Sequence, residues 1–167
     1  RELPGRVVVT GNPVRAEIAA IPERTPGPVH RVLGFGGSRG AHALNVAWAG
    51  ALPQLAGLPV ALTLQTGEAD LPLVREAAAA AGVEAEVLAF LDDLPARLAA
   101  ADLVVSRAGA TTVAELTAAG RAAVLVPFPQ AANDHQRANA GTYLSARASS
   151  GGIARRAKNA MNDSRDA

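Results

Sequence analysis

Short runs rich in β-branched residues alternate with longer Ala- and Leu-rich segments along most of this chain. The short runs have the length of strands and the longer segments have the length of helices. Clusters of Gly and Pro separate them, as chain breakers do. The pattern predicts strands at residues 7–9, 30–35, 60–64, 83–90, 103–105 and 123–126, helices at residues 41–55, 71–81 and 111–119, and a short helix ending at residue 101.

Strands separated by helices of this length imply right-handed βαβ crossovers. The predicted fold class is therefore α/β, a Rossmann-like parallel sheet with helices on both faces. Each glycine cluster follows a strand, so the clusters gather at the edge of the sheet where the strands end. Ligands of such sheets bind at that edge, near the point where the strand order reverses, and we expect the site there.

The composition narrows the possible partners. The 167 residues are 49% hydrophobic and 19% charged with a net charge of +1, which is an ordinary globular balance and gives no reason to expect a nucleic-acid partner. Cys is absent and the three His are far apart, so neither a disulfide framework nor a metal site is expected. The sequence has neither a membrane-length apolar run nor a signal-peptide pattern, which predicts a soluble cytoplasmic domain.

The last 27 residues differ from the rest. Residues 141–167 hold five Lys or Arg against two Asp, and they show no clear apolar period. We therefore expect the folded domain to cover residues 1–140 and to be followed by a divergent basic tail that is frayed or disordered. A basic surface that touches anionic lipid or nucleic acid is the alternative interpretation of this tail.

The loop at residues 34–40 follows a strand and opens a helix. Its glycines allow a close backbone approach, and the free amides of the helix start favour phosphate. Ser38 adds a hydroxyl donor. A tight turn without a ligand is the alternative. A nicotinamide dinucleotide site is disfavoured, because it needs an acidic residue about 20 positions on and residues 41–67 contain none.

A second glycine turn, at residues 106–115, also lies between a strand and a helix. Thr111 and Thr112 are candidates to cap this helix through their hydroxyls, and Glu115, which we expect in its first turn, suits the helix dipole. Capping alone explains these residues. In the functional interpretation, the helix start faces a diphosphate or sugar and Glu115 accepts hydrogen bonds from a ribose diol.

A third cluster, at residues 127–140, is rich in side chains that both donate and accept hydrogen bonds. This density is typical of sugar recognition, although a proline-stopped strand followed by a capped helix would also explain it. Arg15 is either a surface charge or a contact to phosphate. Asp92 and Asp93 are expected to cap a helix, and Trp48 is expected to pack against the sheet.

Six motifs in this order resemble the MurG family of bacterial UDP-N-acetylglucosamine transferases, which belong to glycosyltransferase family 28 and convert lipid I to lipid II. The resemblance covers residues 6–140. The motifs are Thr10-Gly11-Asn12-Pro13-Val14-Arg15, Gly36-Gly37-Ser38-Arg39-Gly40-Ala41 with Leu44-Asn45, Gln65-Thr66-Gly67, Phe90-Leu91-Asp92-Asp93, Ser106-Arg107-Ala108-Gly109-Ala110-Thr111-Thr112-Val113-Ala114-Glu115, and Val126-Pro127-Phe128-Pro129 with Asp134-His135-Gln136 and Asn139-Ala140.

The resemblance implies the C-terminal half of a GT-B glycosyltransferase, which holds the UDP-GlcNAc donor. It also implies a role for individual residues. These are Gly37, Ser38 and Gly40 for donor phosphate, Phe90 and Leu91 for uracil, Ala110, Thr111 and Thr112 for the diphosphate and sugar, Glu115 for ribose, His135 and Gln136 for the GlcNAc hydroxyls, and Arg15 in the interdomain segment.

The sequence also departs from the family pattern. Arg39 stands where the family more often has Gln, and Leu91 stands where it usually has Ile. Beyond Ala140 the strand and helix that finish the family's domain are not recognisable, and the glycine-rich acceptor domain with its His base does not occur in these 167 residues. No catalytic residue is therefore assigned here, and the chain alone is predicted to be inactive.

The resemblance implies an inverting transfer of GlcNAc to lipid I in peptidoglycan synthesis, without a cofactor or metal. The implied partners are the donor, lipid I through the N-terminal domain, and the inner face of the cytoplasmic membrane, to which the full-length enzyme is peripheral. Two alternatives remain open. One is a non-catalytic UDP-GlcNAc-binding subunit that works with a separate membrane-bound partner. The other is a domain like that of the UDP-sugar 2-epimerases, which needs acidic and His catalytic residues of its own.

Overall fold

A computed structural model of the chain describes residues 11–37, 40–128 and 135–149. The strands are β1 (His30–Phe35), β2 (Val60–Gln65), β3 (Ala85–Leu88), β4 (Leu103–Ser106) and β5 (Ala122–Leu125). The helices are α1 (Ala16–Ala19), α2 (His42–Leu55), α3 (Leu71–Ala81), α4 (Leu94–Ala100), α5 (Ala110–Ala118) and α6 (His135–Ser149). None of these helices is long and apolar enough to cross a membrane.

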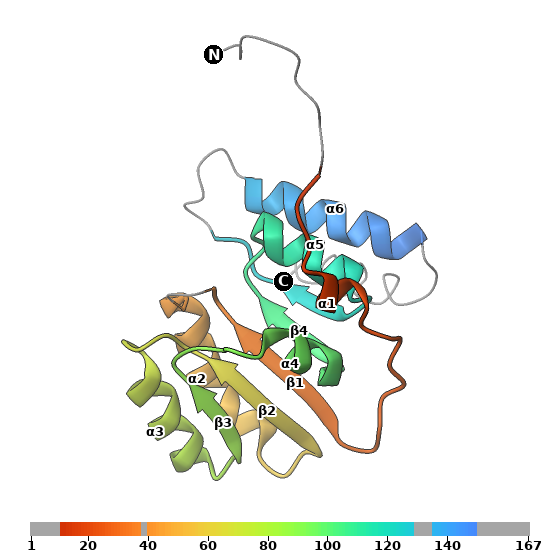
Figure 1. Cartoon of the computed structure of the whole chain (residues 1–167). Helices are drawn as coiled ribbons and strands as arrows, with labels where there is room; N and C mark the ends of the chain where they lie inside the picture. Colours follow the sequence, from red (N-terminus) through yellow and green to blue (C-terminus); the bar gives the residue numbers. More distant parts are fainter. Residues whose placement is uncertain (1–10, 38–39, 129–134, 150–167) are drawn as a thin grey trace, which may run out of the picture.

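The strands form one parallel sheet in the order β3-β2-β1-β4-β5 (Figure 1). The chain runs outward from β1 to β2 and β3, then crosses back to place β4 on the other side of β1. The strand order therefore reverses between β1 and β4, and the loops after these two strands diverge there. The predicted α/β class with parallel strands is confirmed. The strand predicted at residues 7–9 lies outside the described residues.

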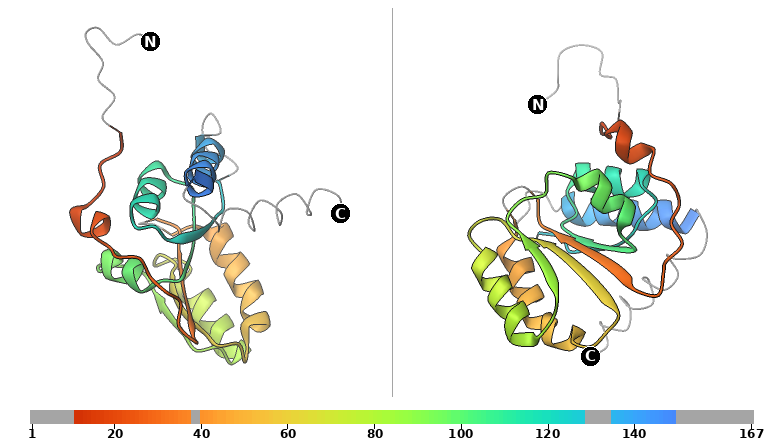
Figure 2. Two further views of the ribbon diagram at one scale, coloured as in Figure 1. Left: turned by 90° about the vertical axis from the view of Figure 1, so that its right-hand side faces the viewer. Right: turned by 60° about the horizontal axis from the view of Figure 1, so that its bottom comes forward.

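Helices cover both faces of the sheet (Figure 2). On one face, α2 and α3 enclose an apolar cluster with the sheet, namely Leu52, Leu62, Leu64, Val74, Ala78 and Val87. Trp48 packs on this cluster, as expected, and lies against Gly34 of β1. A Cβ atom on Gly34 would come within 2.8 Å of the indole nitrogen of Trp48, so the close packing of α2 on the central strand requires a glycine there.

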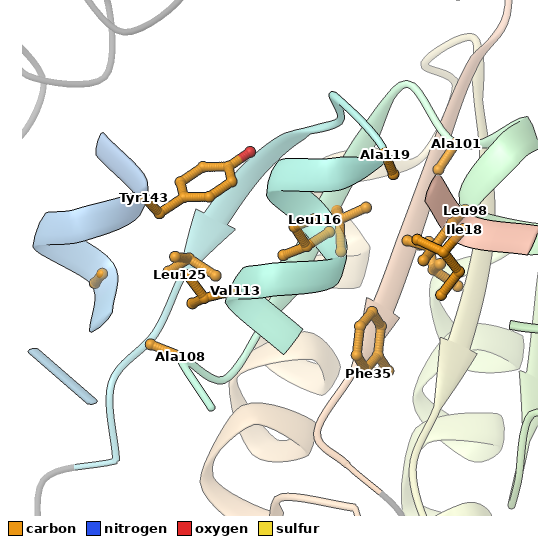
Figure 3. Packing of buried hydrophobic residues seen from close by; sticks show 13 residues of the cluster. Ile18, Phe35, Leu98, Ala101, Ala108, Val113, Leu116, Ala119, Leu125 and Tyr143 are labelled. Carbon is orange, nitrogen blue, oxygen red and sulfur yellow. The ribbon is translucent and has the colours of Figure 1, made fainter. Parts of the chain in front are cut away.

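The opposite face carries a larger cluster, to which α1, α4, α5 and α6 contribute (Figure 3). Leu33 and Phe35 of β1 and Val104 of β4 point into it, whereas their neighbours along each strand point to the other face. Ile18 of α1 is fully buried in this cluster, so the segment before β1 is anchored to the domain. Further bonds hold this segment: the Arg24 side chain donates to Asp102, and Arg121 donates to the carbonyl of Pro22.

Two helices differ from the sequence prediction. The segment before β1, where the sequence predicts no helix, contains the single turn α1. Helix α6 continues across residue 140, where the sequence predicts the domain to end, and reaches Ser149. It packs on α5, and Tyr143, which is 3% exposed, donates a hydrogen bond to the carbonyl of Arg121. Residues 141–149 thus belong to a helix that contributes to the core, while residues 150–167 lie outside the described part of the chain.

Candidate nucleotide-sugar site

A cleft of about 580 Å³ opens where the strand order reverses. Its walls come from the loop after β1, the first turn of α2, the loop after β4, the first turn of α5 and the segment after β5. The lining residues are Phe35, Gly36, Gly37, Gly40, Ala41, His42, Ala43, Arg107, Gly109, Thr112, Phe128 and Gln136. Because α2 and α5 both begin here, the cleft receives the unpaired backbone N–H groups of two helix starts.

The shape of the glycine loop depends on Gly36 and Gly40. Gly40 has φ +74°, and a Cβ atom there would lie 1.9 Å from the carbonyl oxygen of Thr66. On Gly36, a Cβ would lie 2.5 Å from that of Ala41. The loop can therefore pass close to the turn after β2 because position 40 carries no side chain, and it can fold back on Ala41 because position 36 carries none. At these two positions only backbone lines the cleft.

A second pocket of about 240 Å³ adjoins the cleft, and Phe35, Gly37 and Thr112 line both. Its remaining lining residues are Arg15, Gln65, Phe90, Leu91, Leu94 and Glu115. Phe90 is 55% exposed, so an aromatic face is available to a flat ligand at the rim. The pocket thus combines an apolar rim with a carboxylate.

Glu115 is the acidic group of this second pocket and is only 7% exposed. Its Oε1 accepts a hydrogen bond of 2.9 Å from Nε of Arg15, whose side chain is 46% exposed. In the described part of the chain, no other side chain bonds to Glu115. The buried carboxylate therefore has a cation beside one oxygen, and its Oε2 can still accept a hydrogen bond from a ligand.

Gln65 joins the loops that carry the two cavities. This buried side chain accepts a bond of 3.4 Å from the N–H of Gly36 and donates one of 3.0 Å to the carbonyl of Ala89. The loop after β1 is thus tied to the segment that presents Phe90. These loops follow β1 and β3, which lie on either side of β2. Gln65, at the end of β2, is therefore placed to bridge them.

Arg107 places a guanidinium group on the wall of the larger cleft. Its Nη1 donates to the carbonyls of Val126 and Pro127, at 3.3 and 3.2 Å, and its guanidinium lies 5.5 Å from the ring centroid of Phe128. These contacts fix the guanidinium while leaving it on the cleft wall. The sequence analysis did not assign Arg107 to the site, although its place directly after a strand end was a usable signal.

The start of α6 closes the far end of the cleft. The side-chain oxygen of Gln136 accepts a 2.8 Å bond from the N–H of Phe128, and Asn139 donates a 3.0 Å bond to the carbonyl of Ala108. Both polar side chains of the third sequence cluster therefore hold the loops after β4 and β5 in place. Gln136 also lines the cleft.

The predicted site residues divide into three groups. Seven line the cavities, namely Arg15, Gly37, Gly40, Phe90, Leu91, Thr112 and Glu115, and Gln136 joins them from α6. Ala110 and Thr111 lie in the first turn of α5, and His135 begins α6. All three residues are exposed, and none of them lines either cavity. Ser38 lies outside the described residues.

The structure differs from three predictions about helix starts. Gly109, not a threonine, is the N-cap of α5, and no side chain caps this helix. Glu115 lies beyond the first turn, because the helix begins at Ala110. Asp93 is the N-cap of α4 but makes no side-chain capping bond; its carboxylate pairs with Arg97 instead. The backbone amides at the start of α5 are therefore not taken up by Thr111 or Thr112.

The fold and the site define a class of protein: a Rossmann-like domain with two joined cavities at its switch point. Glycines line these cavities, and two helices begin at them. The sequence profile of the glycosyltransferase family 28 C-terminal domain matches residues 31–150. This chain belongs to that family. The predicted fold, the C-terminal half of a GT-B glycosyltransferase, is confirmed.

Several similar proteins share one name, UDP-N-acetylglucosamine--N-acetylmuramyl-(pentapeptide) pyrophosphoryl-undecaprenol N-acetylglucosamine transferase. The chain is 52% identical to that of Geobacter sp. (strain M21), over 79% of this chain and 37% of the relative, and 51% identical to that of Bordetella parapertussis, over 78% and 38%. The crystal structure of Acinetobacter baumannii MurG is 38% identical with a TM-score of 0.67, over 77% of this chain and 38% of that one. The chain thus spans less than two fifths of the length of these relatives.

Proposed function

We propose that this chain is the donor-binding half of an inverting transferase that moves N-acetylglucosamine from UDP-GlcNAc to lipid I, giving lipid II in peptidoglycan synthesis. The observation that carries the proposal is the pair of joined cavities at the switch point, with Glu115 in the smaller one and two helix starts in the larger one. The names of the relatives support the choice of donor and acceptor.

The two cavities match the parts of a nucleotide sugar. The smaller pocket has an apolar and aromatic rim at Phe90 and Leu91 for uracil and a carboxylate at Glu115 for the ribose diol. Gly37 and Thr112 line both cavities, so the diphosphate crosses there, between the starts of α2 and α5. The sugar then lies in the larger cleft, whose volume is typical of small-molecule sites.

The charges of the site suit an anionic leaving group. Arg15 offsets the negative charge of Glu115, so the carboxylate does not repel the diphosphate strongly. The amides of two helix starts and the guanidinium of Arg107 face the cleft where the diphosphate would lie. As the bond between the anomeric carbon and the UDP oxygen breaks, the charge that develops on the β-phosphate is stabilised by these groups.

The other half of the reaction is assigned to the part of the relatives that this chain does not span. A base there takes the proton from the acceptor hydroxyl, whose oxygen attacks the anomeric carbon from the side opposite UDP. Lipid I is a membrane lipid, so the whole enzyme works at the inner membrane surface. We therefore expect this chain alone to bind the donor without transferring its sugar.

Calorimetric titration of the purified chain with UDP-GlcNAc, UDP-GalNAc and UDP tests the proposal. We expect saturable binding with a preference for UDP-GlcNAc over UDP-GalNAc. Replacing Glu115 with Ala removes a hydrogen-bonded carboxylate and should weaken binding about tenfold to a hundredfold. The matched control is Glu76→Ala, which removes an exposed carboxylate from α3, outside both cavities.

The control should bind the donor as the wild type does. A folded wild-type chain, shown by a cooperative thermal melt, that binds none of the three ligands would refute the proposal. Equal affinity of the Glu115→Ala and wild-type chains would leave donor binding standing but remove the assignment of ribose to Glu115.

A further inference from the structure

His42 stands at the first position of α2, on the wall of the larger cleft. Its side chain is 75% exposed, and its Nδ1 lies 2.9 Å from Oδ1 of Asp70, in the loop after β2. The family motifs in the sequence do not include this residue, and the sequence analysis gave it no role. An imidazole thus lies on the wall of the cleft that the proposed function gives to the donor.

Asp70 is itself held firmly. Its Oδ2 accepts a 2.7 Å bond from the amide of Asn45, which is 1% exposed and also donates 2.8 Å to the carbonyl of Thr66. The bond from Asn45, followed by that from His42, lowers the pKa of Asp70 below its ordinary value. Asp70 is thus a carboxylate at neutral pH, fixed to the start of α2 and able to orient a partner.

The carboxylate of Asp70 decides which ring nitrogen of His42 faces it as a donor. Because Oδ1 of Asp70 can only accept, the hydrogen on Nδ1 of His42 points at it in both charge states of the ring. Nε2 is then the nitrogen that is free of Asp70, on a residue that lines the cleft. With Nε2 protonated, the ring is a cation with a donor available to an anion.

We propose that His42 contacts the diphosphate of the donor through Nε2–H, and that Asp70 is the positioning residue that holds the ring for this contact. The inference rests on the proposed function, because it takes the nucleotide diphosphate as the ligand. It adds a side-chain cation on the α2 side of the cleft, across from Arg107 on the β4 side. The diphosphate would then lie between two cations rather than beside Arg107 alone.

Among the described residues, three other charged groups lie around His42 at the cleft. Asp70 faces it from the loop after β2, Glu68 is exposed in the same loop, and Arg107 lines the opposite wall. Imidazoles generally change charge between about pH 5 and 8, whereas the diphosphate diester of UDP-GlcNAc does not titrate in this range. A contact that the protonated ring makes would weaken as pH rises through this range, and the affinity for UDP-GlcNAc would fall with it.

The experiment measures the affinity for UDP-GlcNAc at pH 6, 7 and 8 for the wild type, His42→Ala and His42→Gln. At pH 6 both variants should bind about threefold to tenfold more weakly, and their affinity should change much less with pH. His30→Ala is the matched control, since His30 is exposed at the start of β1, at the opposite edge of the sheet. Uridine, which lacks the diphosphate, should bind all four chains equally.

Asp70→Asn, alone and combined with His42→Ala, tests the positioning role. We expect the single change to weaken binding and flatten the pH profile, and to have little further effect once His42 is gone. If His42→Ala and His42→Gln bind UDP-GlcNAc as the wild type does at every pH, the inference is overturned while the proposed function stands. If the wild type binds no donor at all, the proposed function itself fails.

Discussion

Replacing Gly40 with Ala should destabilise the protein far more than the same change at Gly37, three residues earlier. Both glycines have positive φ angles, +74° and +96°, so an alanine is strained at either position. They differ in their surroundings. A Cβ on Gly40 would lie 1.9 Å from the carbonyl oxygen of Thr66, whereas one on Gly37 would meet nothing within 4 Å.

The magnitudes follow from this difference. The left-handed conformation costs an alanine about 1–2 kcal/mol, and the stiffer unfolded chain returns about 0.4–1 kcal/mol, so Gly37→Ala should lose about 1 kcal/mol. In Gly40→Ala the carbon must also move more than 1 Å away from the Thr66 oxygen to reach an ordinary contact of about 3.3 Å. Backbone must shift to allow this, and the total should reach about 2–4 kcal/mol.

Thermal melts followed by circular dichroism would measure the effect. For a chain of this size about 3 °C of Tm corresponds to 1 kcal/mol, so we expect a fall of about 3 °C for Gly37→Ala and about 6–12 °C for Gly40→Ala. Donor affinity provides a second comparison: Gly37 lines both cavities, so its alanine should weaken binding despite the small change in Tm. Equal losses of Tm in the two variants would refute the assignment of the larger cost to the Thr66 contact.

Three further predictions concern other parts of the structure. Burial raises the pKa of Asp102, but bonds from the Arg24 side chain and from a backbone N–H outweigh this and leave its pKa below the ordinary value. Its ion pair therefore stabilises the fold fully above about pH 4, and this stabilisation is lost as pH falls through the lowered pKa. In urea unfolding at pH 7, Asp102→Asn should lower the free energy of unfolding by about 1–3 kcal/mol, and the loss should be smaller at pH 3. Tyr143→Phe leaves a buried carbonyl without its hydroxyl donor and should cost about 1–2 kcal/mol in the same assay, whereas an unchanged midpoint would show that this bond does not hold α6. Arg15→Ala should weaken UDP-GlcNAc binding less than Glu115→Ala does. In calorimetry, the double variant should lose less binding free energy than the sum of the two single losses, because the pair acts through one carboxylate. Strict additivity would argue against this coupling.

The sheet could be predicted from the sequence because its strands are short runs rich in apolar residues, with breakers on both sides. His30–Phe35 is such a run, and the prediction matched its bounds. The continuation of helix α6 beyond residue 140 was missed because only one side of this helix touches the protein: Ala140 and Tyr143 are buried, while most other described positions are polar or exposed. A helix stabilised by a few tertiary contacts has a weak apolar period, so its sequence resembles that of a loop.

The candidate site was predictable where a backbone feature defines it. Gly37 and Gly40 could be placed at the cleft from their position after a strand, since parallel strands all end at one edge. Side-chain pairings across long sequence distances could not be deduced. Nothing in the sequence alone pairs Arg15 with Glu115, 100 positions away, because their meeting depends on how the segment before β1 lies on α5.

The central position of β1 also dictates when the site can form. During synthesis β1, β2 and β3 emerge in order and can pair with one another at once, but the other edge of β1 stays open until β4, 68 residues after β1 ends, reaches it. Closing so long a loop is slow compared with adding a neighbouring strand. One wall of the cleft belongs to the loop after β1 and the other to the loop after β4, so the cleft forms only when these two strands pair. A nascent chain that stops before β4 therefore has half a binding site. Donor binding would accordingly distinguish chains that have completed this folding step from those that have not.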